Sequence, residues 1–282
     1  MKKLRLPNPV LYGDTYYHHV EISKIKSGRI AETTSIIKNT GNVFKGMEMC
    51  LRGCIVAFCS DELDDKVEDQ HFINKIIPEL SYKTQEYIMI QAFLLYDGID
   101  GKLSGIYSCP LCKNKILCRS PHNEDEEDTR DSVDDLEVVY NESENLHIIH
   151  ELLNPVTISN KKTGEVIQQI FAITYRYPTL KDCISAYQKI GDSNSAKLQF
   201  AIMANAITHI NGEEVEQKWR NEWGMVVLSN IEDVIADINA VSRKFDEFGI
   251  KNAKTKYCPS CGEQWEQAID ITSFFYYGLG LN

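Results

Sequence analysis

The spacing of hydrophobic positions changes several times along the first half of the chain. Polar and apolar residues alternate over residues 16–36 around Ser27-Gly28, which predicts a β-hairpin. From Val43 to Phe58 the apolar residues recur at intervals of three and four, which predicts a helix. A shorter helix or turn is expected over residues 72–80. A longer helix is predicted over 81–98, with Ser81 as its N-cap and Asp97-Gly98 at its end.

The middle of the chain is predicted to be rich in strands. Residues 102–118 have the pattern of a strand, a cysteine-containing turn and a returning strand. Residues 146–178 predict a β-hairpin that turns at residues 162–164, where the sequence is Lys-Thr-Gly.

A helical pattern follows, and we expect a small helical bundle over 179–249. Thr179 is the N-cap of its first helix, which extends to about Ile190, with Asp182 in the reciprocal capping position and Gly191 after the end. Three further helices are predicted over 195–210, 213–228 and 230–248, with an Asn-Gly pair ending the second helix of the bundle. The expected regions are therefore 1–122, 123–145, 146–178, 179–249 and 250–282.

Composition is that of a globular protein of one or two domains. The 282 residues are 43% hydrophobic and 25% charged. No apolar run reaches the ~18 residues of a membrane-spanning helix, and the start MKKLRLPNPV lacks the apolar region of a signal peptide. We therefore expect no membrane partner. Nine cysteines, four of them in metal-type pairs, indicate a reducing environment rather than a disulfide framework.

The net charge of −11 is concentrated in one segment. Residues 123–144 contain eleven acidic residues and one arginine, so the rest of the chain is close to neutral. Such a segment is typical of a solvated loop, and a docking site for a basic partner is the alternative. No basic stripe is present that could neutralise phosphates, so we expect no nucleic-acid partner.

Two matched cysteine pairs carry the candidate chemistry. Cys109 and Cys112 in "YSCPLC", and Cys258 and Cys261 in "YCPSCG", share the same spacing and the same proline. Each Cys-x-x-Cys turn, called a knuckle below, presents two thiolates, and two knuckles complete a tetrahedral site that zinc prefers, with iron as the less favoured metal. Because sulfur fills all four positions, the predicted role is structural.

The two knuckles are separated by 145 residues, whereas ~12–20 residues separate them in compact zinc sites. The metal would thus clamp the end of the chain to its middle. The predicted fold class is α+β: a β-rich scaffold with a split four-cysteine, zinc-ribbon-like clamp and an inserted helical bundle.

The remaining cysteines and the histidines suggest no second site. Cys50 and Cys54 lie on the apolar stripe of a predicted helix, and Cys59 and Cys183 are also expected in a core. Cys118 is a weaker alternative as a metal ligand. The two histidines of "HIIH" (147–150) would point in opposite directions on a strand. No known catalytic motif is present, so we expect no enzymatic activity.

Four aromatic residues follow the second knuckle. Phe274, Phe275, Tyr276 and Tyr277 either cap the core of the ribbon or form a docking patch for a partner, because Phe and Tyr are enriched at the centres of interfaces.

The order of these motifs resembles a known family. The stretch "YKTQEYIMIQAFLLYDGIDGKLSGIYSCPLC" is followed by "YRYPTL", by "AITHINGEEV", and by "CPSCGEQWEQAID" with a terminal "SFF". This is similar to the baseplate hub assembly proteins, or tail assembly chaperones, of contractile-tailed bacteriophages, from about residue 80 onward. Lys113 stands where glycine is usual in the first knuckle.

The resemblance implies a non-enzymatic protein that helps to build the tail baseplate hub. Its partners would be other tail and hub proteins, and its location would be the host cytoplasm during assembly or the tail baseplate of the virion. The four cysteines match the family's metal-binding knuckles. The alternative function is that of a zinc-ribbon protein which binds nucleic acid or acts in transcription, and an unrecognised enzyme is a third interpretation.

Overall fold

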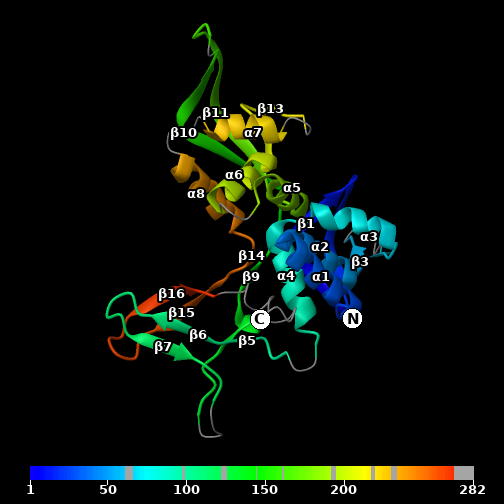
Figure 1. The fold of residues 1–282 in the computed structure, drawn as a ribbon, viewed down its shortest axis with the longest axis vertical. Coiled ribbons are helices and arrows are strands. Elements are labelled where there is room, and N and C mark those ends of the chain that lie inside the picture. Colours follow the sequence, from blue (N-terminus) through cyan, green and yellow to red (C-terminus); the bar gives the residue numbers. More distant parts are fainter. Residues whose placement is uncertain are drawn as a thin grey trace.

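The computed structural model describes residues 1–60, 66–96, 99–121, 126–143, 145–160, 162–191, 195–216, 220–229 and 234–269. It confirms the α+β class, because helices and strands are both abundant and mixed along the chain (Figure 1). Among these residues, no helix is long and apolar enough to cross a lipid bilayer.

The N-terminal part is built on a four-stranded antiparallel sheet. Its strands are β1 (Lys2–Tyr12), β2 (Thr15–Ile22), β3 (Ile55–Cys59) and β4 (Lys66–Val67), in that order. Tyr12 pairs with Thr15 across a two-residue turn, in which Gly13 has a φ of 64°. A glycine is favoured there because a side chain is strained at positive φ.

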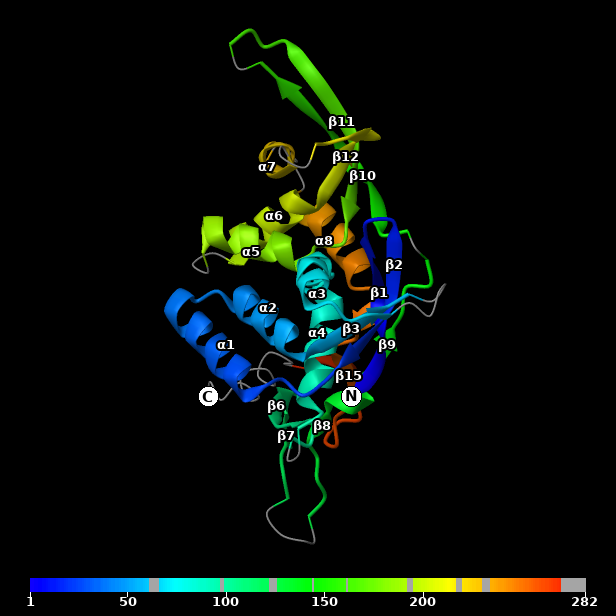
Figure 2. The same cartoon turned by 90° about the vertical axis from the view of Figure 1, so that its right-hand side faces the viewer.

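Four helices cover one face of this sheet, on its left in Figure 2. They are α1 (Ser27–Thr40), α2 (Val43–Cys54), α3 (Gln70–Ile76) and α4 (Tyr82–Phe93), and a 3-10 turn, η1 (Ile77–Glu79), links the last two. The Ser81 hydroxyl accepts a hydrogen bond from the Thr84 amide, so the predicted N-cap of α4 is confirmed. The predicted helix from Val43 is also present, although it ends at Cys54 and the chain continues as β3.

The hairpin predicted around Ser27-Gly28 is wrong. Lys26 is extended and α1 begins at Ser27, so Gly28 lies in the first helical turn. The amides of that turn have no intrahelical partner in any helix, which makes glycine inexpensive there. Ile30 and Ile37 pack against the core as parts of this helix, and these tertiary contacts outweigh the local alternation.

A second sheet forms the other half of the molecule. Its strands are β10 (His147–Ser159), β11 (Val166–Arg176), β12 (Ile207–Ile210) and β13 (Glu213–Glu214), all antiparallel. The predicted hairpin over 146–178 is therefore present as β10 and β11, with Gly164 at a φ of 73° in its turn.

The described part of residues 179–249 contains four helices, and two strands lie between them. The helices are α5 (Leu180–Ile190), α6 (Ser195–Ala206), α7 (Arg220–Ser229) and α8 (Val234–Phe245). Residues 207–210 and 213–214, predicted as the end of one helix and the start of the next, instead form β12 and β13. The Asn211-Gly212 pair, predicted as a helix end, is the turn between these strands, and both of its residues have positive φ. Ile210 pairs with Ile173 of β11, and this long-range pairing outweighs the local helical pattern. The capping box of Thr179 and Asp182 at the start of α5 is confirmed.

The third part of the described structure consists of short strands from the middle of the chain and from its C-terminal segment. They are β5 (Lys102–Leu103), β6 (Gly105–Ser108), β7 (Lys115–Cys118), β8 (Asp131–Ser132), β9 (Val138–Val139), β14 (Gly249–Ile250), β15 (Ala253–Tyr257) and β16 (Gln264–Ala268), with a 3-10 turn, η2 (Val133–Asp135). Strand β6 pairs with β7, and β15 pairs with β16. We call these two hairpins the ribbon.

Residues 131–139 of the acidic segment form regular structure and are partly buried. Strand β8 pairs with β5, and β9 pairs with β14. Val133 and Leu136 are buried in the N-terminal core, and Asp131 is buried as well. The expectation of a solvated loop is therefore wrong for residues 131–139, because two apolar side chains anchor this stretch.

The described chain has two hydrophobic cores. The first joins the β1–β4 sheet, its helices, and residues that return from later in the chain, namely Leu180, Ile250 and Ile269. The second joins β10–β12 with α6, α7 and α8. The two are linked by α5, which follows directly on the bridge between Ser81 and Thr179.

The packing of α7 on α6 generates a stability prediction. A Cβ atom added to the buried Gly224 would lie 2.5 Å from the carbonyl oxygen of Ala204, so α7 would have to move away from α6. We expect Gly224→Ala to lower the free energy of unfolding by about 1–3 kcal/mol, as overpacking does. Gly28→Ala is the control, because open space surrounds that position; its stability should be unchanged or raised by up to about 1 kcal/mol. If denaturant unfolding showed the same decrease in free energy for both variants, the close contact between α6 and α7 at Gly224 would not be the cause.

Candidate metal centre

Each knuckle is the turn of one ribbon hairpin. The Cys109 amide donates to the Asn114 carbonyl, and the Lys113 amide donates to the Cys109 carbonyl. In the second knuckle the Cys258 amide donates to the Glu263 carbonyl, and the Gly262 amide donates to the Cys258 carbonyl. The two turns therefore have the same hydrogen-bond pattern, although they differ in sequence.

The residue after the second cysteine of each pair has a left-handed backbone. Gly262 has a φ of 78° and Lys113 has a φ of 61°. Glycine adopts this conformation freely, whereas lysine is strained in it. In the first knuckle the Lys113 ammonium donates to the Pro110 carbonyl at 2.8 Å, which compensates for part of the strain. The turn predicted by the cysteine spacing thus forms even where glycine is absent.

The structure brings the four predicted ligands together. The Sγ atoms of Cys109, Cys112, Cys258 and Cys261 all lie within 4.8 Å of one another. The sulfurs of Cys109 and Cys261 are 3.6 Å apart, as are those of Cys112 and Cys258. A tetrahedral ion with metal–sulfur bonds of about 2.3 Å requires sulfurs about 3.8 Å apart. The cluster therefore has nearly the dimensions that a metal ion would need.

The electrostatics of the thiols also favour a bound cation. Burial opposes ionisation of Cys258, but the amides of Ser260 and Cys261 and the Cys112 thiol lower its pKa to about 6. The Glu263 amide favours the Cys261 thiolate, yet burial and the neighbouring thiols raise that pKa to about 12. The Cys258 thiolate therefore forms readily, and its negative charge then disfavours ionisation of the neighbouring Cys261 thiol. A cation at the centre removes this repulsion and allows all four sulfurs to ionise.

A partly buried polar cluster lies next to the four sulfurs. The Lys256 ammonium lies 2.5 Å from the Asp131 carboxylate, 4.6 Å from the centre of the Tyr107 ring and 3.6 Å from the Cys118 sulfur. The Tyr107 hydroxyl donates to Asp131 at 2.8 Å. Lys256 and Tyr107 each precede a knuckle by two residues, so this cluster ties the two hairpins together a short distance from the sulfurs.

Sequence reasoning missed this cluster. Asp131 is one of eleven acidic residues in its segment, and its immediate neighbours do not distinguish it from the others. Its position two residues before the apolar Val133 is the one available signal. Cys118, the weaker candidate ligand, contacts Lys256 and is not among the four clustered sulfurs.

The other predicted residues have simpler positions. Cys50, Cys54, Cys59 and Cys183 are all buried, as expected. Phe274, Phe275, Tyr276 and Tyr277 lie outside the described residues. His147 is exposed and His150 is buried on the opposite face of β10, as predicted, and the His150 ring lies 2.6 Å from the Asp237 carboxylate.

Comparisons of the chain with protein-family models, with curated proteins and with solved structures give no match.

The cluster predicts one metal ion per chain. Cys258→Ser removes a ligand and should abolish stoichiometric metal binding and cooperative unfolding of the ribbon, because the binding free energy of a structural metal contributes directly to folding. Elemental analysis of freshly purified, reduced protein measures the first effect and hydrogen exchange the second. Cys59→Ser, at a buried cysteine outside the cluster, is the control and should retain the metal. Wild-type protein without stoichiometric metal would contradict the assignment.

The Lys256–Asp131 pair predicts a further loss of stability. Asp131→Asn leaves the partly buried Lys256 charge without its partner and should destabilise the ribbon by up to about 3–5 kcal/mol. Asp135→Asn is the matched control, because it breaks the pair of β15 Lys254 with a carboxylate that is 68% exposed and should cost at most about 1 kcal/mol. Thermal or chemical unfolding of the metal-loaded variants measures the difference. Similar values for both would show that Asp131 does not support the hairpins.

Proposed function

We propose that this protein is a non-enzymatic assembly component that holds two docking surfaces at a fixed separation, and that it acts in the tail baseplate hub of a contractile-tailed bacteriophage. The resemblance of its motif order supports the place of action. The distribution of exposed apolar side chains supports the mode of action and is the observation that carries the proposal.

Exposed apolar side chains are concentrated on two projecting elements. Among the described residues, nine of the twelve large apolar side chains that are exposed lie on the β10–β11 hairpin or on the ribbon. The hairpin carries Ile149, Leu153, Val166, Ile167 and Phe171, and the ribbon carries Ile106, Leu111, Leu117 and Tyr257. Clustered exposed apolar residues are typical of protein–protein contact sites.

The two elements lie at opposite ends of the molecule. The hairpin extends beyond the helices at the top of Figure 1 and the ribbon lies at the lower left; the second view in Figure 2 agrees. On the ribbon, Ile106 and Leu117 are direct cross-strand partners, so their side chains form one patch. This arrangement suits a protein that bridges two partners.

We infer that the metal is structural zinc. Four cysteine ligands saturate a tetrahedral zinc ion and leave no position for a substrate or a reactive water. Iron binds similar sulfur sites, but zinc needs no redox partner to serve as a clamp. In this proposal the metal keeps the ribbon patch in place and takes part in no reaction.

The proposal predicts two separable interactions. On co-expression with hub proteins of a contractile tail, we expect a complex in size-exclusion chromatography. The double variant Ile149→Ser, Phe171→Ser should lower the affinity for one partner at least about tenfold, as loss of an interface hot spot does. The double variant Ile106→Ser, Leu117→Ser should lower the affinity for a second partner to a similar degree.

The control is Leu11→Ser, at an exposed apolar position on β1 that belongs to neither group of exposed apolar side chains. It should leave both interactions unchanged. Absence of any complex would contradict the hub assignment, and salt-sensitive DNA binding would favour the nucleic-acid-binding alternative instead.

A further inference from the structure

A cavity lies at the junction of the two hydrophobic cores. Its volume is about 290 Å³, and its lining comes from α2, α4, α5, α6, α8 and the segment between β11 and α5. Sites for small organic ligands are typically concave, mostly apolar, and begin at about 300 Å³. The cavity therefore has room for a ligand the size of an aromatic ring with a short side chain. None of the four clustered cysteines lines it.

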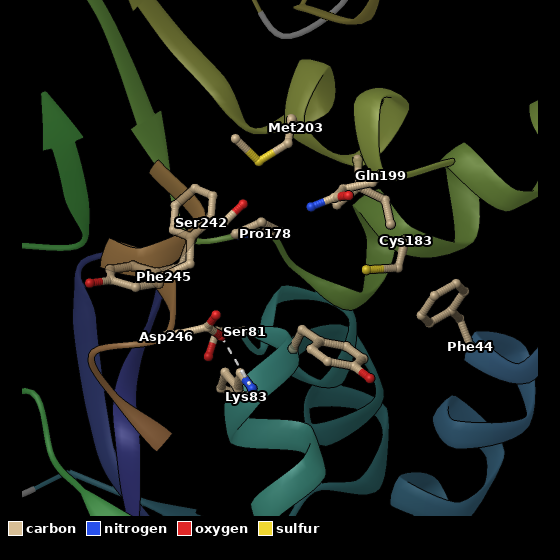
Figure 3. Close-up of a pocket in the computed structure, with 13 residues that line it drawn as sticks. Phe44, Ser81, Lys83, Pro178, Cys183, Gln199, Met203, Ser242, Phe245 and Asp246 are labelled. Carbon is tan, nitrogen blue, oxygen red and sulfur yellow. Dashed lines mark ion pairs between the residues drawn. The ribbon is translucent and has the colours of Figure 1, made fainter. Parts of the chain in front are cut away.

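The walls of the cavity are mainly aromatic. Phe44 and Tyr82 pair edge to face with ring centroids 6.3 Å apart, and Tyr177 and Phe245 pair with centroids 5.5 Å apart. In Figure 3, Phe44 and Phe245 lie on opposite sides of the cavity, with Met203 above it. Aromatic rings pack favourably against the edges and faces of other rings, and a methionine sulfur also contacts rings favourably. These walls therefore suit a ligand with an aromatic body.

The charged groups at the cavity balance each other. Lys83 and Asp246 lie together at its lower edge in Figure 3, with the ammonium and a carboxylate oxygen 3.3 Å apart. Glu86 lies 3.5 Å from the same ammonium, but it does not line the cavity, and burial raises its pKa. Burial also raises the pKa of the lining Cys183 thiol, so this thiol is uncharged at neutral pH. One positive and one negative group line the cavity, and they already pair with each other.

This balance disfavours a ligand of either charge. The Lys83 ammonium would repel a cation and the Asp246 carboxylate would repel an anion, and either ion would lose hydration among the aromatic walls. Uncharged polar groups are available instead, because the Gln199 amide from α6 and the Ser242 hydroxyl from α8 also line the cavity. In Figure 3 the Gln199 amide points into the cavity. Both groups can hydrogen-bond to an uncharged donor or acceptor.

We propose that this cavity binds a small uncharged molecule that has an aromatic body and one hydrogen-bonding group, an alcohol or an amide. The body lies between the two aromatic pairs, and the polar group bonds to the Gln199 amide or to the Ser242 hydroxyl. Because the ligand contacts helices of both cores, its binding stabilises their junction. This proposal is independent of the assembly function proposed above.

Three probes that share one aromatic body test the preference for an uncharged ligand. They are 2-phenylethanol, 2-phenylethylamine and phenylacetate, titrated calorimetrically into the full metal-loaded chain. We expect the alcohol to bind at least about tenfold more tightly than the amine or the carboxylate, because only the charged probes lose ionic hydration and meet a like charge. Failure of the alcohol to bind would overturn the proposal, as would a charged probe that binds as tightly as the alcohol.

Variants that fill the cavity test the location. Ser242→Phe places a ring in the cavity and should lower the affinity for 2-phenylethanol at least about tenfold. Arg243→Phe adds the same side chain at the next residue of α8, which is exposed and does not line the cavity, and should leave the affinity unchanged.

A second filling variant keeps the test decisive if Ser242→Phe does not fold. Gln199 is exposed on α6 and lines the cavity, so Gln199→Phe should fold and should also lower the affinity for the alcohol at least about tenfold. If the folded filling variants bound the alcohol as tightly as Arg243→Phe does, the alcohol would bind elsewhere and the proposal would be wrong.

Discussion

Four sulfur atoms join two hairpins that lie far apart in the sequence, and the arrangement of the ribbon depends on that junction. Closing a loop of 145 residues costs about 4 kcal/mol of chain entropy. Binding of a structural metal by four thiolates contributes about 10–16 kcal/mol, which is more than enough to offset it. The two-stranded hairpins are small and would be marginal by themselves, so a metal ion bound by the four cysteines would supply stability that their packing cannot.

The sulfur cluster does not act alone. Lys256 and Asp131 form a partly buried ion pair between the second hairpin and the acidic segment, and Tyr107 connects the first hairpin to the same carboxylate. A buried charge is costly unless it is paired, so this cluster favours one alignment of the hairpins over others. The acidic segment therefore has a structural role through one of its residues.

The two cores meet along α5 and around an aromatic-lined cavity. The helices on either side come from distant parts of the sequence, which makes the junction the place where the N-terminal and C-terminal halves contact each other.

Sequence patterns are sufficient to predict a feature when interactions within a few residues determine its structure. The C-x-x-C spacing, with a proline after the first cysteine, identifies both knuckles, and the capping box at Thr179 and the cap at Ser81 identify two helix starts. These signals depend on backbone geometry within a few residues. The Asn211-Gly212 pair is also a turn signal, but it fits the end of a helix as well as the β-hairpin that it turns.

The sequence by itself determined the α+β class, the identity of the four clustered cysteines and the burial of the core cysteines. Only the tertiary structure decided that residues 207–210 join a sheet, that residues 27–40 form a helix, and that Asp131 pairs with Lys256. Each of these three depends on contacts with residues far away in the chain. Local spacing does not encode such contacts, because the free energy that selects them comes from burial and pairing in the assembled fold.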